Sequence, residues 1–290
     1  MSTTVNYARL EGIEKSELPG AIVLAAVYVP LFIFNVARSI RHPTYVLIVL
    51  SFFCAIRVTA FTLRAILSGS DTAGENISLV IAESIIYSVG FFGLLYSAYT
   101  LVLDRAKMPH PTTPSQGLLG LLLSIISNRR IIRLALTAAV ALGITAGSMM
   151  GASAPSTLAT AGTLRKASTY LFLAVAACLV LVAAHLALVE LSGGHTAPGA
   201  PLGRRHRVVV LLGIALPCLA REAFYAATQK DLAQQDNARL WYPLSALTEL
   251  LAVALFAVPG LVPSRREIAE AEQVKTGGSS SETELHGYGA

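Results

Sequence analysis

The chain has 290 residues, of which 54% are hydrophobic and only 13% are charged, and its mean hydropathy is +0.63. Soluble proteins carry about 25% charged residues, so this chain cannot cover a core with a polar surface, and its solvent must be lipid. The net charge of +5 comes from short basic clusters between apolar runs. That placement indicates membrane topology and argues against nucleic acid as a partner.

Seven stretches of the chain are long and apolar enough to cross a hydrocarbon core, which takes about 20 helical residues. They lie at residues 19–40, 45–67, 77–103, 131–150, 167–191, 208–227 and 240–262. Segments rich in Gly, Pro and Ser separate them, and one of these loops is expected at residues 151–162. A shorter apolar run at residues 117–126 suits the membrane interface or an extension of the fourth helix. The sequence therefore predicts an all-α, multi-pass membrane protein built as a bundle of seven transmembrane helices.

The loops differ in their content of Lys and Arg, and this difference predicts the orientation of the bundle. The tail and loops of one side hold six basic residues, which are Arg9, Lys15, Arg165, Lys166, Lys230 and Arg239. Those of the other side hold twelve, which are Arg38, Arg41, Arg105, Lys107, Arg129, Arg130, Arg204, Arg205, Arg207, Arg265, Arg266 and Lys275. Because the basic side faces the cytoplasm, we expect the N-terminus outside and the C-terminus in the cytoplasm.

These boundaries divide the chain into three parts. Residues 1–18 form a short extracytoplasmic tail, residues 19–262 the transmembrane domain, and residues 263–290 a cytoplasmic tail. The last segment is rich in Ser, Gly and Glu and is expected to be disordered. We expect this membrane to be that of the endoplasmic reticulum or the plasma membrane.

Several sites with known sequence signatures are missing from the chain. It has no Walker loop, no helix with paired zinc-binding histidines, no aspartate-rich magnesium site and no Gly-rich dinucleotide turn. Cys54, Cys178 and Cys218 are scattered within apolar segments, which suits small buried residues better than a disulfide framework or a zinc site. We therefore expect no cofactor and no metal.

Charged residues inside the spans are the main functional signal, because a charge at membrane depth is costly and usually serves a function. With the predicted orientation, six such residues fall in the outer half of the bilayer. They are Arg57 and Arg64 in the second span, Glu83 in the third, Arg221 and Glu222 in the sixth, and Glu249 in the seventh. Three guanidinium groups and three carboxylates at similar depth are expected to pair with one another.

Two interpretations of this constellation stay open at this point. The pairs can lock four helices together without any further role. Alternatively, they line a polar cavity in which Arg57, Arg64, Arg221 and Glu222 bind the oxygenated or anionic head of a small lipophilic molecule, and Glu249 or Glu83 acts as an acid. We favour the cavity, since six charges exceed what locking four helices usually needs.

Small residues and prolines mark further features of the bundle. Gly143, Gly147 and Gly151 form a stripe along the fourth span, which predicts close helix packing within the bundle or between the subunits of a homo-oligomer. Pro217 and Pro259, like Pro30 in the first span, are expected to kink their helices.

Short motifs in four spans carry a resemblance to a known family. The motifs are residues 28–30 (YVP), the segment from Arg38 to Arg57, residues 216–221 (LPCLAR) with Tyr225, and Glu249 with residues 259–261 (PGL). The chain resembles an uncharacterised family of fungal seven-transmembrane-helix integral membrane proteins, and more distantly fungal lipid-translocating exporters. The family pattern emphasises an Arg, a Pro-x-x-x-Arg and a Glu that correspond here to Arg57, Arg221 and Glu249. It implies a filamentous fungus, in which such proteins can accompany secondary-metabolite pathways.

Three functions are compatible with these observations. The first is a membrane-bound cyclase or isomerase, or an accessory protein, that handles a lipophilic metabolite. The second is a lipid or metabolite transporter, which the odd number of spans and the lack of an internal repeat disfavour. The third is a seven-helix receptor, but the number of helices is the only argument for it, and an inference of function from fold alone is an analogy. In each case the expected partners are membrane lipids and a small lipophilic molecule.

Overall fold

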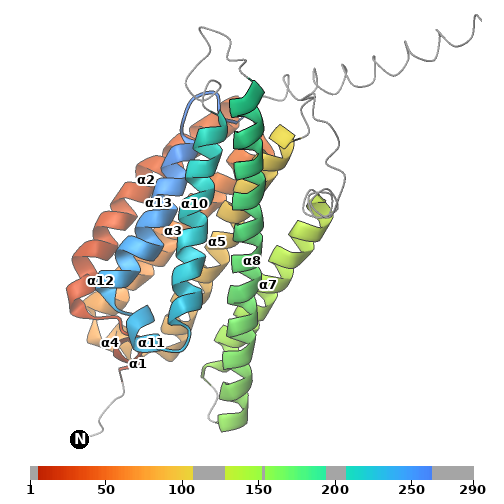
Figure 1. Ribbon diagram of the computed structural model, residues 1–290. Helices are drawn as coiled ribbons and strands as arrows, with labels where there is room; N and C mark the ends of the chain where they lie inside the picture. Colours follow the sequence, from red (N-terminus) through yellow and green to blue (C-terminus); the bar gives the residue numbers. More distant parts are fainter. Residues whose placement is uncertain (1–5, 107–127, 152–153, 194–206, 263–290) are drawn as a thin grey trace, which may run out of the picture.

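The computed structural model describes residues 6–106, 128–151, 154–193 and 207–262, and these residues form an elongated bundle of helices (Figure 1). The helices that cross the bundle are α2 (Leu18–Arg41), α3 (Tyr45–Gly69), α5 (Ile77–Ala106), α7 (Arg129–Met149), α8 (Pro155–Gly193), α10 (Arg207–Thr228) and α13 (Leu247–Phe256). Short helical pieces lie between them, namely α1 (Tyr7–Leu10), a 3₁₀ turn at Lys15–Glu17, α4 (Asp71–Gly74), α11 (Leu232–Gln235), α12 (Ala238–Trp241) and a π-helical turn at Tyr242–Ala246. The apolar run at residues 117–126 and the tail from residue 263 onward lie outside the described residues.

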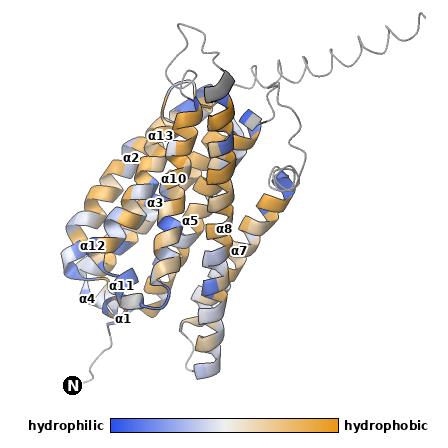
Figure 2. Ribbon diagram, viewed as in Figure 1, coloured by the Kyte–Doolittle hydropathy of each residue, from blue (hydrophilic) through white to orange (hydrophobic). Residues whose placement is uncertain are grey.

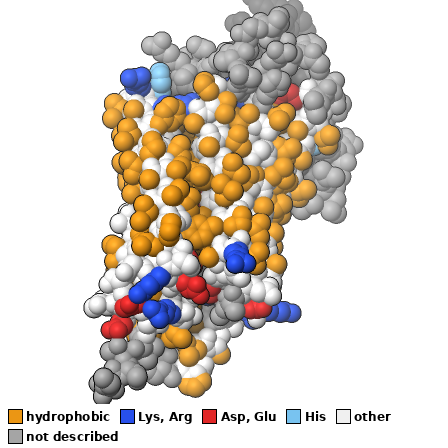
Figure 3. All heavy atoms as spheres, turned by 90° about the vertical axis from the view of Figure 1, so that its left-hand side faces the viewer, with side chains coloured by type: hydrophobic (Ala, Val, Ile, Leu, Met, Phe, Trp, Pro, Cys, Tyr) orange, Lys and Arg blue, Asp and Glu red, His pale blue; other side chains and the backbone are white. Residues whose placement is uncertain are grey.

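Seven helical segments among the described residues are long and apolar enough to cross a membrane, which confirms the predicted class. The seventh is the continuous run Ala238–Phe256, which consists of α12, the π-helical turn and α13. Hydrophobic residues fill the middle of the bundle, and polar residues gather toward its ends (Figure 2). On the face drawn in Figure 3, a belt of hydrophobic side chains separates charged side chains at the two ends. This distribution is expected of a surface that contacts hydrocarbon chains, in which each backbone polar group is satisfied within its helix.

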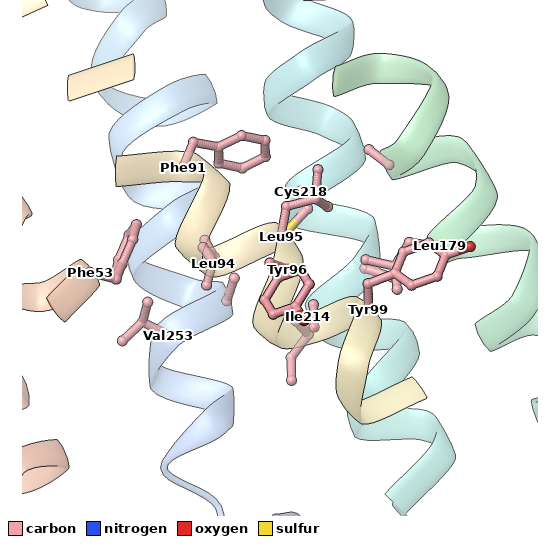
Figure 4. Close-up of a cluster of buried hydrophobic side chains, with 14 of the residues drawn as sticks. Phe53, Phe91, Leu94, Leu95, Tyr96, Tyr99, Leu179, Ile214, Cys218 and Val253 are labelled. Carbon is pink, nitrogen blue, oxygen red and sulfur yellow. The ribbon is translucent and has the colours of Figure 1, made fainter. Parts of the chain in front are cut away.

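Helix α5 lies at the centre of the bundle. It packs against α3 on one side and against α7 and α8 on the other, while α10 lies between α8 and α13. Phe91, Leu94 and Leu95 of α5 are fully buried there, against side chains such as Phe53 of α3 and Ile214 of α10 (Figure 4). This apolar packing sets the spacing of the helices that carry the charged residues.

Two helix boundaries differ from those expected from the sequence. Helix α8 begins at Pro155, so most of the predicted loop at residues 151–162 is helical. Pro155 occupies the first helical position, where its missing N–H costs no hydrogen bond, and the Ala, Thr and Leu residues that follow continue the helix despite Gly162. As a result, Arg165 and Lys166 lie on a helix rather than beside a loop.

The seventh span is the second correction, because its helix ends at Phe256 and not at residue 262. Pro259 therefore follows the helix instead of kinking it, since the residue before a proline is disfavoured in the α conformation. Gly260 then takes a positive φ of 82°. Arg38 donates to the carbonyl oxygen of Phe256 (3.1 Å), and Arg207 donates to that of Gly260 (3.0 Å), so side chains satisfy acceptors that the ending helix leaves free.

The small-residue stripe of α7 packs inside the chain. A Cβ atom on Gly143 would lie 3.2 Å from Ser168 Oγ of α8, and one on Gly147 would lie 3.1 Å from Ile85 of α5. At these distances the neighbouring side chains would have to shift by a few tenths of an ångström to admit a Cβ atom, so the glycines allow close packing of α7 against α5 and α8. Association of chains through this stripe stays a prediction, and contacts within one chain already cover Gly143 and Gly147.

One end of the bundle gathers α1, α4, α11 and α12 (Figure 1). Asp71 of α4 accepts from Arg9 (2.9 Å) and Lys15 (2.8 Å), and these exposed ion pairs join the N-terminal segment to the loop between α3 and α5. This is the end whose loops hold fewer basic residues. We call it the N-terminal end, and its location outside the cytoplasm stays a prediction.

The orientation can be tested with reporters at the two ends. A reporter fused after Ala290 is expected in the cytoplasm, and one inserted after Ser70 is expected outside, because the basic loops lie at the opposite end from Ser70. Protease protection of the two reporters in sealed vesicles measures this directly. The reverse pattern would invert the bundle, and protection of both reporters on the same side would contradict an odd number of spans.

Candidate functional site

Glu249 is the centre of a buried cluster of charges. Its carboxylate oxygen Oε1 lies 2.6 Å from Nη2 of Arg57 and 2.6 Å from Nε of Arg221, so one oxygen faces two guanidinium groups. The three residues come from α13, α3 and α10. Arg57 and Glu249 have no more than 1% of their side-chain surface exposed. The pairing that the sequence predicts between these spans is therefore present, and it joins three helices.

Arg57 is held from a fourth helix as well. Its Nη1 atom donates to the carbonyl oxygen of Tyr87 on α5 (2.6 Å), and its guanidinium group lies 4.0 Å from the Tyr87 ring. Gly90, one turn further along α5, makes room for it, because a Cβ atom there would lie 3.1 Å from Arg57 Nη1. Both terminal nitrogens of Arg57 thus have protein partners, Nη1 in Tyr87 and Nη2 in Glu249, which leaves them little capacity for a ligand.

Arg221 has a second carboxylate in Glu222, the next residue along α10, and its Nη1 atom donates to Glu222 Oε1. The guanidinium group lies over the rings of Phe91 (4.0 Å) and Tyr225 (4.7 Å), a geometry typical of cation–π contacts. Arg57, Arg221, Glu222 and Glu249 thus form a first cluster, with two positive and two negative formal charges.

Arg64 belongs to a separate, second cluster. Its Nε atom donates to Glu17 Oε2 (2.8 Å), its Nη1 atom donates to Glu83 Oε1 (3.2 Å), and its guanidinium group lies 4.0 Å from the Trp241 ring. This cluster has one positive and two negative formal charges. The six residues that the sequence places at similar depth are thus divided in two, and Glu17 is added to them.

A cavity of about 280 Å³ lies between α5, α7, α8, α10 and α11. Of the six residues predicted for the site, Arg221 and Glu222 line it, whereas Arg57, Arg64, Glu83 and Glu249 are not among its lining residues. The cavity thus reaches the first cluster from one side. Its volume lies just below the range for small-molecule sites, about 300–1,000 Å³.

The walls of this cavity are amphipathic. Phe172, Met150 and Leu158 contribute apolar surface, together with Gly143, Ala146, Gly147, Ala161 and Gly162. The polar lining residues are Ser84, Ser88, Arg165, Lys166, Ser168, Thr169, Arg221, Glu222, Tyr225, Gln229 and Gln235. An apolar body and a polar head can both be accommodated here, since an apolar pocket with a few polar groups is what small lipophilic ligands occupy.

Hydroxyl groups connect the cavity to the first cluster. Ser245 lies in the π-helical turn before α13, and its Oγ atom lies 2.8 Å from the Tyr87 hydroxyl and 3.0 Å from that of Tyr225. Tyr225 also accepts from Trp241 Nε1 (3.0 Å) and lines the cavity. Tyr87 lies at the other end of this series of hydroxyl groups, and its carbonyl oxygen and ring contact Arg57. Turns of this type are frequent at functional sites.

A second hollow, of about 890 Å³, lies at the N-terminal end, and Glu14, Glu17, Asp236, Arg239 and Tyr242 are among the residues that line it. Burial, together with the nearby carboxylates of Glu11 and Glu17, raises the pKa of the Asp236 carboxyl to about 6. The lining thus combines the acidic residues Glu14, Glu17 and Asp236 with the basic residues Arg9 and Arg239. Glu17 lines this hollow and also belongs to the second cluster, so the second cluster borders a hollow at the N-terminal end.

Sequence reasoning missed several of these residues for identifiable reasons. Glu17 lies outside the first span that hydropathy predicts, although it directly precedes Leu18, the first residue of α2. Arg165 and Lys166 were assigned to a loop, because the helical stretch from Pro155 carries a Gly and several Ser and Thr residues. Gln229 follows α10 and Gln235 ends α11, where no sequence pattern distinguishes them from ordinary loop residues.

The fold and the two clusters define a multi-pass membrane protein with buried ion pairs and an amphipathic cavity. In a comparison with protein families, residues 20–264 match the family described as a domain of unknown function (DUF7702). The chain belongs to this family, whose match covers all seven spans apart from the first residues of the first one. No curated protein and no solved structure matches the chain significantly.

Proposed function

We propose that this protein binds a small lipophilic molecule with an oxygenated or anionic head in the cavity between α5, α7, α8, α10 and α11. The observation that carries the proposal is the lining of this cavity, where apolar side chains such as Phe172 adjoin the cationic groups of Arg165, Lys166 and Arg221. Guanidinium and ammonium groups bind carboxylate and phosphate oxygens through charge-assisted hydrogen bonds. Arg221 and Glu222 keep the ligand-binding role that the sequence assigns to them.

Arg165 and Lys166 are the better candidates for the head group than Arg57 or Arg64. Arg57 and Arg64 each face carboxylates from other elements, whereas neither Arg165 nor Lys166 forms an ion pair within 4 Å among the described residues. A cation without such a pair can interact with a ligand without first losing a protein contact. The two residues follow one another on α8, so the head group is expected near this turn.

Acid catalysis would depend on Glu222 in this arrangement. The sequence suggests Glu249 and Glu83 as acids, but neither of them lines the cavity. Glu222 lines it and also contacts Arg221. A cyclase or isomerase of a fungal secondary-metabolite pathway, the leading hypothesis from the sequence, is therefore proposed with Glu222 as its acid, and transport of the same ligand as the alternative.

The proposal is tested by filling the cavity. Gly162 lines it, and a Cβ atom on this residue would meet nothing within 4 Å. Gly162→Leu therefore adds a side chain to an exposed part of the cavity wall without a clash at its Cβ atom, and it is expected to narrow the cavity. Binding of decanoic acid, measured by native mass spectrometry of the protein released from micelles, is expected to fall at least tenfold, because the added side chain occupies the ligand's volume.

Ala159→Leu is the matched control, since Ala159 is an exposed residue on the same helix and does not line the cavity. It adds the same side chain and is expected to bind decanoic acid as the unmodified protein does. Absence of binding to the unmodified protein, or equal binding by the Gly162→Leu protein, would remove the cavity as a ligand site.

A further inference from the structure

Two glutamine side chains at the polar end of the cavity have hydrogen-bonding atoms without partners. They are Nε2 and Oε1 of Gln229 and Oε1 of Gln235, all three buried, and no other atom of the described residues hydrogen-bonds to them. Gln235 as a residue is only 3% exposed. Buried polar side chains in folded proteins nearly always have a partner, so atoms left without one at the wall of a cavity indicate a ligand or bound water.

The position of these amides suits the recognition of a head group. Gln229 directly follows α10, and Gln235 is the last residue of α11, so both belong to the N-terminal end of the bundle. Arg221 lies about 10 Å further into the bundle along α10 than Thr228, the last residue of the helix, at 1.5 Å per residue. The amides therefore lie toward the outer part of the cavity, and Arg221 lies deeper.

The chemistry of the amides differs from that of the cations in the same cavity. Arg165, Lys166 and Arg221 can only donate hydrogen bonds, whereas each amide oxygen can only accept them. A simple carboxylate or carbonyl group would satisfy the cations and the Nε2 donor of Gln229. It would leave the Oε1 atoms of Gln229 and Gln235 without a partner, since it has no hydrogen to donate.

We infer that the ligand of this cavity carries a hydroxyl group beside its anionic or carbonyl oxygen, and that Gln229 and Gln235 recognise the hydroxyl group. This inference rests on the proposed function, because it concerns the same cavity. It narrows the ligand to oxygenated lipophiles such as hydroxy acids and related hydroxycarbonyl compounds. Unsubstituted fatty acids and hydrocarbons satisfy the apolar walls but not these acceptors.

The inference is tested with two probes that differ by one hydroxyl group, decanoic acid and 2-hydroxydecanoic acid. The unmodified protein in micelles is expected to bind the hydroxy acid about tenfold more tightly, because only this probe can donate to the amide oxygens. Gln229→Leu and Gln235→Leu are expected to reduce this preference to twofold or less. Both variants should keep their affinity for decanoic acid within about threefold, since the cations and the apolar walls are unchanged.

Gln234→Leu is the matched control, because Gln234 precedes Gln235 in α11 but is exposed and does not line the cavity. It is expected to keep the full preference for the hydroxy acid. Equal affinity of the unmodified protein for the two probes would overturn the inference and assign the free amide atoms to bound water. In that case decanoic acid still binds, whereas failure of the proposed function would leave neither probe bound.

Discussion

Replacing Glu249 with Gln is expected to lower the free energy of unfolding by about 3–5 kcal/mol, the usual cost of removing one partner from a buried ion pair. Its Oε1 atom lies 2.6 Å from both Arg57 and Arg221. Without the carboxylate, the first cluster keeps two guanidinium groups and only Glu222 to compensate them. Equilibrium unfolding in mixed micelles with increasing SDS measures the change, and the abundance of the protein in the membrane is expected to fall with it.

Two further variants separate loss of charge from loss of shape. Asp71→Asn makes the same carboxylate-to-amide change in an exposed pair, where little effect is expected because solvent screens the charges. The double variant Arg57→Met with Glu249→Leu removes a buried pair together and leaves Arg221 with Glu222. It should be clearly more stable than the sum of the two single changes predicts.

The outcome decides between the two interpretations of the charged residues. A Glu249→Gln protein with normal stability and abundance but without decanoic acid binding or metabolite conversion would restore Glu249 to a functional role. The geometry favours a structural role in joining helices for Glu249, because this residue is buried, does not line the cavity and contacts two arginines. The functional interpretation then applies to Arg221 and Glu222, which belong to the cluster and line the cavity as well.

The seven spans could be predicted from the sequence because the bilayer imposes them directly. A helix that crosses hydrocarbon needs an uninterrupted apolar stretch, and five of the seven expected ranges agree with the structure within a few residues at each end. The two larger errors, at the start of α8 and the end of α13, occur where helix and loop differ little in hydropathy. There, Pro155 starts a helix and Pro259 follows one.

The pairing of the charges could be foreseen only in outline. Depth along a helix follows from residue number, so Arg57 and Glu249 were expected at similar levels. Which arginine faces which carboxylate depends on the rotation of each helix about its axis, and 192 residues separate these two partners. The sequence suggests a polar cavity but not its position or most of its lining, because its volume results from how α7 and α8 pack against α5 and α10, and no local pattern in the sequence determines that packing.

Replacing Arg64 with Met is expected to destabilise the protein more than replacing either of its carboxylate partners. Arg64 is the only cation of the second cluster, and it contacts both Glu17 and Glu83. Its loss leaves two buried carboxylates without a cation of the cluster, so the cost should lie at or above about 5 kcal/mol, the upper end for a broken buried pair. Glu83→Gln leaves one guanidinium group facing one carboxylate, and Gln can still accept from Arg64. A cost of only about 1 kcal/mol is therefore expected for Glu83→Gln.

The charge count gives this prediction a direct control. Adding Glu17→Gln and Glu83→Gln to Arg64→Met removes every formal charge from the second cluster, and it should recover much of the stability lost in the single variant. SDS unfolding of Arg64→Met, of Glu83→Gln and of the triple variant provides the comparison. If Arg64→Met and Glu83→Gln cost the same, charge balance does not control this cluster. If Glu83→Gln leaves stability intact but abolishes metabolite conversion, Glu83 is an acid of the kind that the sequence suggests, and the second cluster has a function of its own.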